Sequence, residues 1–221
     1  MDEDDITDDE VTDPEIDGDA VTFLIGEHQQ QFRVPIERTL SNAYIVEDTI
    51  HSDEVGAVVT GARWNRLNPA AFRPVYEFLK YGDWRPRLRF GRFPGLSRKP
   101  EVRAREAYRC IVVWNMAREL QIEELMEVAL EKLGRLGTHP FAMVMGVPLV
   151  FGVESDGTEQ DITMRNFMIQ HAVDNFTTYQ ITAAEKFWAL QEKFPEFVGE
   201  VVDKFAVKLK QQTEMNAERE D

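Results

Sequence analysis

The sequence predicts an α+β protein in which a small β-sheet is flanked by a cluster of α-helices and followed by further C-terminal helices. Three observations predict this fold class. Two apolar runs at 21–25 and 31–34 lie on either side of a turn-like stretch, which is typical of a β-hairpin. One further short strand candidate follows at 57–60. From residue 68 onward, apolar residues recur at helical spacing instead.

The N-terminal elements follow from turn and start signals. Residues 26–29 begin with Gly26 and predict the turn of the hairpin. Pro35 suits the first turn of a helix, so the sequence predicts a short helix over 36–43. The stretch around His51 is rich in acidic side chains and indicates a surface loop, in which a metal site is the less favoured alternative.

Cap and stop signals mark the middle helices. Asn68 can cap free amide groups and Pro69 suits a first helical position, so a helix is expected from here to Gly82. A pair of helices is expected over 108–133, with a break at 121–122. Glycines at 134 and 137 are expected to close this pair.

The C-terminal part continues the helical pattern. Thr158 and Asp161 have the spacing of a capping box, with Asp in place of Glu, and predict a helix start. A further helix is expected over 182–193, and Pro195 is expected to begin the last one. The polar tail over 211–221 is expected to fray.

Charge is distributed unevenly along the 221 residues. The net charge is −15, and residues 1–20 hold eight Asp and three Glu without a single Lys or Arg. Such a stretch has too few apolar groups to offset the entropy cost of ordering, so we expect 1–18 to be a disordered acidic tail. This tail either solubilises the chain or docks on a basic surface.

A basic stretch occupies the middle of the chain. Residues 80–109 hold ten Lys or Arg against three acidic residues. Pro, Gly and Arg dominate its centre, which predicts a long exposed loop over 85–105. Arginines interleaved with aromatic residues can grip phosphate and stack on bases, so a nucleic-acid-associated regulator using 85–109 is the alternative function. Its candidate contacts are Arg85, Arg87, Arg89 and Arg92.

Composition and motifs disfavour several function classes. The acidic net charge argues against nucleic acid as a partner. Cys110 is the only cysteine, so no intrachain disulfide and no multi-cysteine zinc site can form. No nucleotide-binding or hydrolase motif occurs, and we expect no enzyme, metal or cofactor. We expect Cys110 to be buried and inert, and His171 to be hydrogen-bonded at the edge of the core.

Targeting signals give a further expectation. The N-terminus is acidic, unlike the basic start of a secretory signal. The apolar runs are shorter than the roughly 20 residues of a membrane helix. We therefore expect an intracellular protein of the cytoplasm or nucleus that does not contact a membrane.

Three groups of motifs resemble a known family in their order and spacing. The first is 19–26 with Phe32-Arg33-Val34-Pro35 and Thr39-Leu40-Ser41. The second joins Leu67-Asn68-Pro69-Ala70-Ala71-Phe72 to 75–84 and resembles an acidic-Pro-x-x-Phe helix that ends in Leu-Tyr-x-Gly. The third, at 113–125, resembles a helix pair with the pattern Ala-x-x-Leu-x-Ile-x-x-Leu. Together they resemble a BTB/POZ domain.

The similarity extends toward the C-terminus. Residues 150–153, 164–167 and 194–197 resemble the C-terminal helical extension of fungal BTB-type proteins. The resemblance implies a BTB/POZ-like domain over 19–137, which includes the basic loop, and a C-terminal helical extension over 138–210.

The resemblance also implies a non-enzymatic protein–protein interaction and oligomerisation module. BTB domains self-associate, act as adaptors for cullin-type ubiquitin ligases or join transcriptional regulators. By similarity, the candidate contacts on the first helix are Ile36, Leu40 and Tyr44. Tyr81 and Trp84 are further candidates because aromatic residues are enriched at interfaces, but filling the core is an equal alternative for each. The expected partners are proteins, with a homodimer and a cullin-type ligase scaffold both left open.

Overall fold

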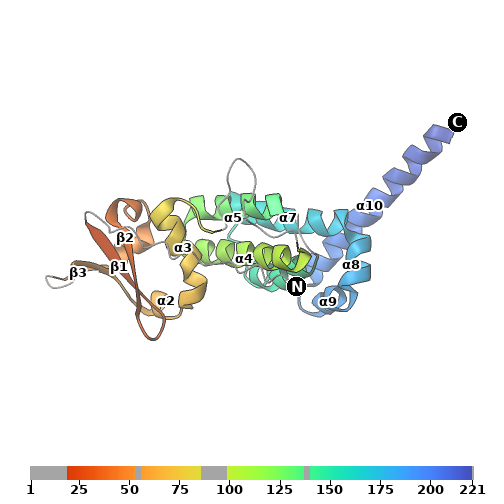
Figure 1. The fold of residues 1–221 in the computed structure, drawn as a ribbon. Coiled ribbons are helices and arrows are strands. Elements are labelled where there is room, and N and C mark those ends of the chain that lie inside the picture. The colour runs from red at the N-terminus through yellow and green to blue at the C-terminus, as the bar shows by residue number, and fades with distance from the viewer. Residues whose placement is uncertain (1–18, 53–55, 86–98, 137–139, 221) are drawn as a thin grey trace, which may run out of the picture. The chain divides into compact units, whose positions relative to one another are not determined.

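The computed structural model describes residues 19–52, 56–85, 99–136 and 140–220. The expected acidic tail over 1–18 therefore lies outside the described residues. The chain forms two compact units, 1–66 and 67–221. The first unit holds the sheet and the second holds most of the helices, so the α+β fold class is confirmed (Figure 1).

The first unit contains a four-stranded sheet in the order β2-β1-β4-β3. Strands β1 (Ala20–Ile25) and β2 (Gln30–Pro35) form the predicted antiparallel hairpin. Its turn begins with Gly26 and ends with Gln29, both at positive φ. Strand β4 (Gly56–Val59), which the sequence predicts, runs parallel to β1.

Strand β3 (Thr49–Ser52) corrects the surface loop expected around His51. It pairs antiparallel with β4 at the edge of the sheet, and His51 lies opposite Ala57. The strand leaves Ile50 57% exposed, so its residues do not show the alternating pattern of a half-buried strand. Pairing with β4, rather than its own composition, makes this segment a strand.

The core of the first unit lies against one face of the sheet. Helix α2 (Ala62–Asn65) packs against β1, and its Trp64 is fully buried. The Trp64 ring meets Phe23 edge to face, with ring centroids 5.3 Å apart. Its indole N–H donates a hydrogen bond of 2.8 Å to the Asp48 carboxylate. The buried indole therefore keeps a polar partner.

The helix predicted over 36–43 forms as two shorter pieces. A 3-10 turn, η1 (Ile36–Arg38), follows Pro35, and α1 (Ala43–Glu47) begins after Asn42. The Thr39 hydroxyl bonds back to the Ile36 carbonyl, which competes with continuation of the helix. Asn42 has extended backbone angles, and its side chain accepts a hydrogen bond from the Ile45 amide. Asn42 therefore caps a new helix, which begins where the predicted helix was expected to end.

Helix α3 (Pro69–Tyr81) opens the second unit and confirms its predicted ends. The Asn68 side chain accepts a hydrogen bond of 2.8 Å from the Ala70 amide, and Pro69 fills the first helical position. Gly82 adopts a left-handed conformation with φ of 77° and ends the helix.

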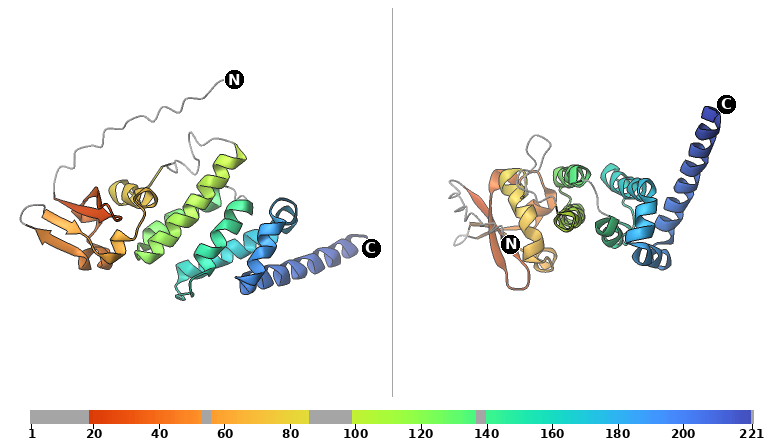
Figure 2. Two further views of the ribbon diagram at one scale, coloured as in Figure 1. Left: turned by 90° about the horizontal axis from the view of Figure 1, so that it is seen from below. Right: turned by 45° about the vertical axis from the view of Figure 1, so that its right-hand side comes forward.

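Helix α4 (Pro100–Glu119) lies at the centre of the second unit. It packs against α3, α5 (Glu123–Leu136) and α6 (Pro140–Phe151), and Figure 2 shows α4 and α5 side by side. The predicted break between α4 and α5 is confirmed, with Gln121 at positive φ and the Ile122 amide bonded to the Ala117 carbonyl.

Three predicted boundaries in this part differ from the structure. Residues 100–105 belong to α4, so the expected loop over 85–105 ends earlier. Gly134 lies within α5 and does not end it. Helix α6 was not predicted, because nearly all its residues are apolar and show no single stripe. Since α6 packs against α4, the boundary expected at 137/138 is not where the compact units divide.

The remaining helices follow α6 in the chain, and the first two of them pack against it. Helix α7 (Glu159–Asp174) begins at the predicted Thr158 cap, and α8 (Phe176–Thr182) follows it. The single helix expected over 182–193 forms as α9 (Ala184–Ala189) and a 3-10 turn, η2 (Leu190–Glu192). Helix α10 (Pro195–Glu220) begins at Pro195 as predicted but continues through the segment expected to fray.

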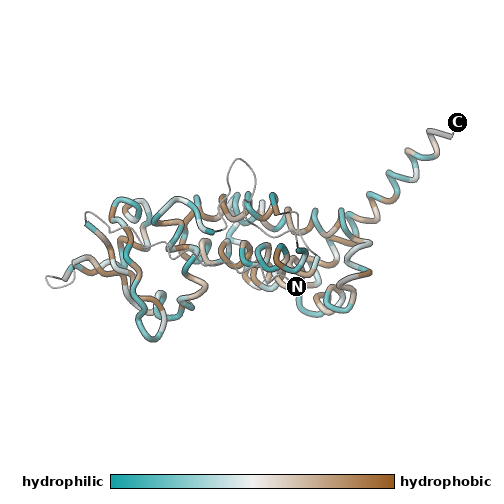
Figure 3. The backbone as a smooth tube through the Cα atoms, viewed as in Figure 1, coloured by the Kyte–Doolittle hydropathy of each residue, from teal (hydrophilic) through white to brown (hydrophobic). Residues whose placement is uncertain are grey.

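The C-terminal half of α10 extends beyond the other helices of its unit (Figures 1 and 2). Its buried residues Phe197, Val198 and Val201 lie in the first two turns. The final turns are mostly hydrophilic, as Figure 3 shows. Lys208 still pairs with Asp174 of α7, so contacts with the rest of the unit hold about the first half of this helix.

Replacing two helical glycines by alanine is expected to change the stability of the protein in opposite directions. A Cβ at Gly146 would lie 2.6 Å from Cδ1 of the fully buried Ile111, so Gly146→Ala is expected to destabilise by about 1–3 kcal/mol. A Cβ at Gly134 meets nothing within 4 Å, so Gly134→Ala is expected to stabilise by up to about 1 kcal/mol. Urea unfolding of both variants and the parent measures the two changes. Equal effects of the two substitutions would contradict the packing of α4 against α6.

Candidate functional site

The contacts expected on the first helix lie on three short segments of the first unit. Ile36 is half-buried in η1, Leu40 follows in the turn and is 65% exposed, and Tyr44 is half-buried in α1. Val46, which the sequence did not single out, is 50% exposed on α1. The Arg63 guanidinium lies 3.7 Å from the centre of the Tyr44 ring and covers it. We call Leu40, Tyr44 and Val46 the α1 surface.

Tyr81 and Trp84 have different environments in the second unit. Tyr81 is half-buried at the end of α3, and the Lys80 ammonium lies 5.3 Å from its ring centre. Trp84 is 1% exposed and belongs to the core. The prediction of Trp84 as an interaction contact is therefore corrected, because a buried indole cannot anchor a partner.

A buried lysine holds Trp84 in place. The Lys132 ammonium donates a hydrogen bond of 2.6 Å to the Trp84 carbonyl and lies 3.8 Å from the centre of its ring. Lys132 also forms an ion pair with Asp83. Burial lowers the pKa of Lys132, and the bond to Asp83 opposes this change. An ammonium with these three partners is engaged structurally rather than presented to a substrate.

Cys110 is buried, as the sequence predicts. Burial raises the pKa of its thiol to about 12. The thiolate, which is the nucleophilic form, is therefore negligible at neutral pH. The predicted burial is confirmed, and it disfavours the reactive form of this cysteine.

The basic stretch is divided between different environments. Arg85 is exposed, and its backbone amide donates a hydrogen bond of 2.8 Å to the Glu77 carboxylate. Arg87, Arg89 and Arg92 lie outside the described residues. On α4, Arg103 donates to the Leu136 carbonyl and Arg109 lies 3.5 Å from Glu106. These two arginines are used within the fold, which reduces the basic surface that the sequence indicated.

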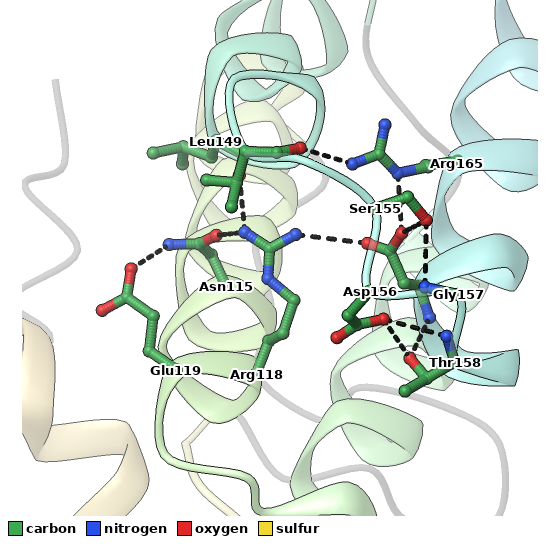
Figure 4. A network of polar contacts seen from close by, with 11 residues as sticks. Asn115, Arg118, Glu119, Leu149, Ser155, Asp156, Gly157, Thr158 and Arg165 are labelled. Carbon is green, nitrogen blue, oxygen red and sulfur yellow. Dashed lines mark hydrogen bonds and ion pairs between the residues drawn. The ribbon is translucent and has the colours of Figure 1, made fainter.

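A polar network joins α4 to α7 through a buried carboxylate (Figure 4). Asp161 is fully buried and lies 3.2 Å from the Arg118 guanidinium and 2.8 Å from that of Arg165. The Ser155 hydroxyl donates a hydrogen bond to the same carboxylate. Sequence reasoning identified Asp161 only as part of a capping box and missed these partners, because Arg118 lies 43 positions earlier in the chain.

The two arginines also fix the segment between α6 and α7. Arg118 donates to the Leu149 carbonyl at 3.3 Å, and Arg165 donates to the Val153 carbonyl at 2.7 Å. The Thr158 hydroxyl accepts from the Asp161 amide at 3.3 Å, which is the expected half of the capping box. The other half is missing, since the Thr158 amide donates to Asp156 instead. The network therefore acts as a structural clamp on this segment.

His171 is hydrogen-bonded at the edge of the core, as predicted. Its Nδ1 lies 2.9 Å from the hydroxyl of Tyr179, which is buried on α8. Burial lowers the pKa of His171 to about 4, and nearby Asp174 opposes this change. Burial also raises the pKa of Tyr179. Both side chains are therefore neutral near pH 7.

The described ranges hold neither a cluster of metal-ligating side chains nor a membrane-spanning helix. Among these residues, no three His, Cys, Asp or Glu side chains gather in a way that could hold a metal ion. His51 is exposed on β3, while Asp53 and Glu54 lie outside the described residues. None of the helices in the described part of the chain is long and apolar enough to span a membrane.

Comparison with known proteins adds no family assignment: no family model, no curated protein and no solved structure matches the chain. The motifs and the geometry of the chain are therefore the grounds for a functional proposal.

The clamp predicts a large effect of a conservative substitution. Asp161→Asn keeps the shape of the side chain but leaves the buried guanidinium of Arg118 without a counter-charge, so we expect destabilisation of about 3 kcal/mol. Glu131→Gln is the matched control, because Glu131 and Arg135 form an exposed pair that contributes less than about 0.5 kcal/mol. Urea unfolding measures the loss of unfolding free energy in both variants. A loss for Asp161→Asn as small as that for Glu131→Gln would refute the clamp.

The neutral histidine predicts a dependence of stability on pH. The folded-state pKa of His171 is about 4, below its ordinary value of 6.5, so its contribution is present above pH 6.5 and is lost as pH falls toward 4. His171→Gln keeps a hydrogen-bonding side chain without this titration. We expect the parent to lose roughly 2–3 kcal/mol more than the variant between pH 7 and 4. Urea unfolding at a series of pH values measures both proteins. Equal losses of unfolding free energy in the parent and the variant across this range would disprove the lowered pKa of His171.

Proposed function

We propose that this chain is a non-enzymatic protein-interaction module of BTB/POZ type that self-associates through the α1 surface. The motifs that resemble this family occur in order on successive elements of the structure. The hairpin β1–β2 is followed by η1 and α1, then by α3, and then by the pair α4 and α5. The order of elements supports the resemblance without depending on any one short motif.

The exposure of Leu40 is the observation that carries the proposal. Leu40 is 65% exposed at a position where the resemblance implies a contact, and Val46, six positions later on α1, is 50% exposed. Single exposed apolar residues are ordinary on monomeric proteins, whereas contiguous apolar patches mark interaction surfaces. Burial of the α1 surface against a partner would remove this area from water.

A second copy of the chain is the partner that we propose for this surface. The Arg63 guanidinium covers the Tyr44 ring, so this surface presents a cation as well as apolar side chains. In a two-fold dimer the same patch meets itself, and no other chain is required. A cullin-type ligase scaffold or a transcriptional regulator would then bind elsewhere, with the chain as adaptor.

The proposal predicts the mass of the protein in solution. Light scattering of the full chain should give twice the chain mass of 25.5 kDa at high concentration. Leu40→Asp places a charge in the dimer interface and should shift the chain to monomer, with a dimer dissociation constant raised at least about a hundredfold.

Ile181→Asp is the control for this experiment, because Ile181 is 79% exposed in the second unit and lies outside the α1 surface. It should leave the dimer intact. A parent that stays monomeric at every concentration, or a Leu40→Asp variant that dimerises like the parent, would rule out self-association through this surface. Thermal unfolding should show that both variants fold.

A further inference from the structure

The second unit holds a small pocket that the proposed self-association does not use. It has a volume of about 250 Å³ and is lined by residues of α4, α5 and α7. Sites for small molecules and cofactors usually have volumes of about 300–1,000 Å³. A pocket of this size therefore suits a single side chain better than a whole small molecule. We call it the α5–α7 pocket.

The deep part of the pocket is apolar. Trp114 of α4 is fully buried, and Met126 of α5 is 5% exposed. Leu130 lies one turn after Met126 and is half-buried. An occupant therefore needs an apolar stem that can lie against these side chains, as the long stems of Lys and Arg do.

The exposed part of the pocket is negatively charged. Glu127 of α5 and Glu159 of α7 both line it, and both are exposed. Among the described residues, no hydrogen bond or ion pair engages either carboxylate group. The other lining residues, Gln160 and Thr163, are uncharged. The lining therefore carries two negative charges and no positive one.

Two arginines near the pocket are engaged elsewhere. Arg118 lies 5.2 Å from the centre of the Trp114 ring, and its side chain is only 8% exposed. Arg118 and Arg165 both pair with the buried Asp161, and each also donates to a backbone carbonyl. Neither arginine belongs to the lining. The clamp thus holds both guanidinium groups, and the two glutamates of the pocket keep their charge.

The surface beside the pocket is acidic as well. Glu123 and Glu124 are exposed in the first turn of α5. Glu123 lies four positions before Glu127, so the two carboxylates share one face of the helix. A ligand with further cations beside the one in the pocket would gain additional attraction here. This favours a basic segment over an isolated cation.

We propose that the α5–α7 pocket binds an arginine side chain from a basic segment of a partner protein. The arginine stem lies along Met126 and Leu130, and its guanidinium donates hydrogen bonds to Glu127 and Glu159. Arginine suits two acceptors because it presents five donors in a fixed, planar fork. The net charge of −15 attracts any basic segment, and the pocket adds selectivity for arginine.

Two peptides that differ in one group test the proposal. They share the sequence Ser-Lys-Gly-X-Gly-Lys-Ser with blocked ends, and X is either arginine or citrulline, which has the same shape without the charge. NMR titration of the full chain at about 0.15 M salt measures both affinities. We expect the arginine peptide to bind at least about fivefold more tightly. The backbone amides of 126–130 and 159–163 should shift on binding.

A matched pair of variants locates the binding. Glu127→Gln combined with Glu159→Gln removes both charges from exposed side chains without changing their shape, and should reduce the preference for arginine to less than about twofold. Glu185→Gln combined with Glu196→Gln is the control, because it removes the same charge at exposed positions outside the pocket. The control should weaken both peptides equally and keep the full preference.

Occupying the pocket from within the chain is an independent test. Thr163→Arg places a guanidinium on α7 beside the same two carboxylates, so it should abolish the preference for the arginine peptide. Ile162→Arg adds the same charge at a neighbouring position that is 48% exposed and does not line the pocket. This second variant should keep the preference.

Each outcome supports or overturns the proposal. Equal affinities of the two peptides, amide shifts confined to other parts of the chain, or a preference that survives the loss of Glu127 and Glu159 would overturn it. A preference lost equally in the control would reveal attraction by net charge alone and would overturn it too. Leu40 belongs to the first unit and the pocket to the second, so Leu40→Asp should change neither affinity. The pocket and self-association can therefore fail independently.

Discussion

The helical unit depends on α4, which is buried on several faces at once. Its buried residues include Ala107, Ile111, Trp114 and Ala117, and α3, α5 and α6 pack around it. Near its C-terminus, Arg118 joins it to Asp161 of α7. Its Trp114 also lines the α5–α7 pocket. A helix in this central position packs against helices on both sides of residue 137/138, where the resemblance implied a domain boundary.

Local physics explains which elements the sequence predicts. The caps at Asn68 and Thr158 and the stop at Gly82 act within a turn of the chain, so residue types alone reveal them. Strand β3 and helix α6 depend instead on distant partners, β4 and α4, and neither has a clear period of its own. The same reason explains why the sequence did not show that Trp84 is buried, because Lys132 holds it in the core from 48 positions away. The candidate contacts of the α1 surface were accessible to sequence reasoning through resemblance, whereas the α5–α7 pocket required the packing of three helices.

The chain uses its charges in two ways. Buried ones are matched, as Lys132 with Asp83 and Asp161 with Arg118 and Arg165 show, because an unpaired charge in the interior is costly. Exposed charges are matched less strictly, and Lys186 lies over the Phe141 ring without an ion pair among the described residues. The exposed apolar side chains include Leu40 and Val46 of the α1 surface, which is where we propose that the chain meets a second copy.

Hydrogen exchange on the full chain tests most directly whether α4 joins the helices into one cooperative unit. The core amides of α4, α5, α6 and α7 should exchange through a single opening with a common free energy, while the last turns of α10 exchange much faster. If α6 and α7 instead open at a clearly lower free energy than α4 and α5, the C-terminal helices form a separate extension. The central role of α4 would then be contradicted.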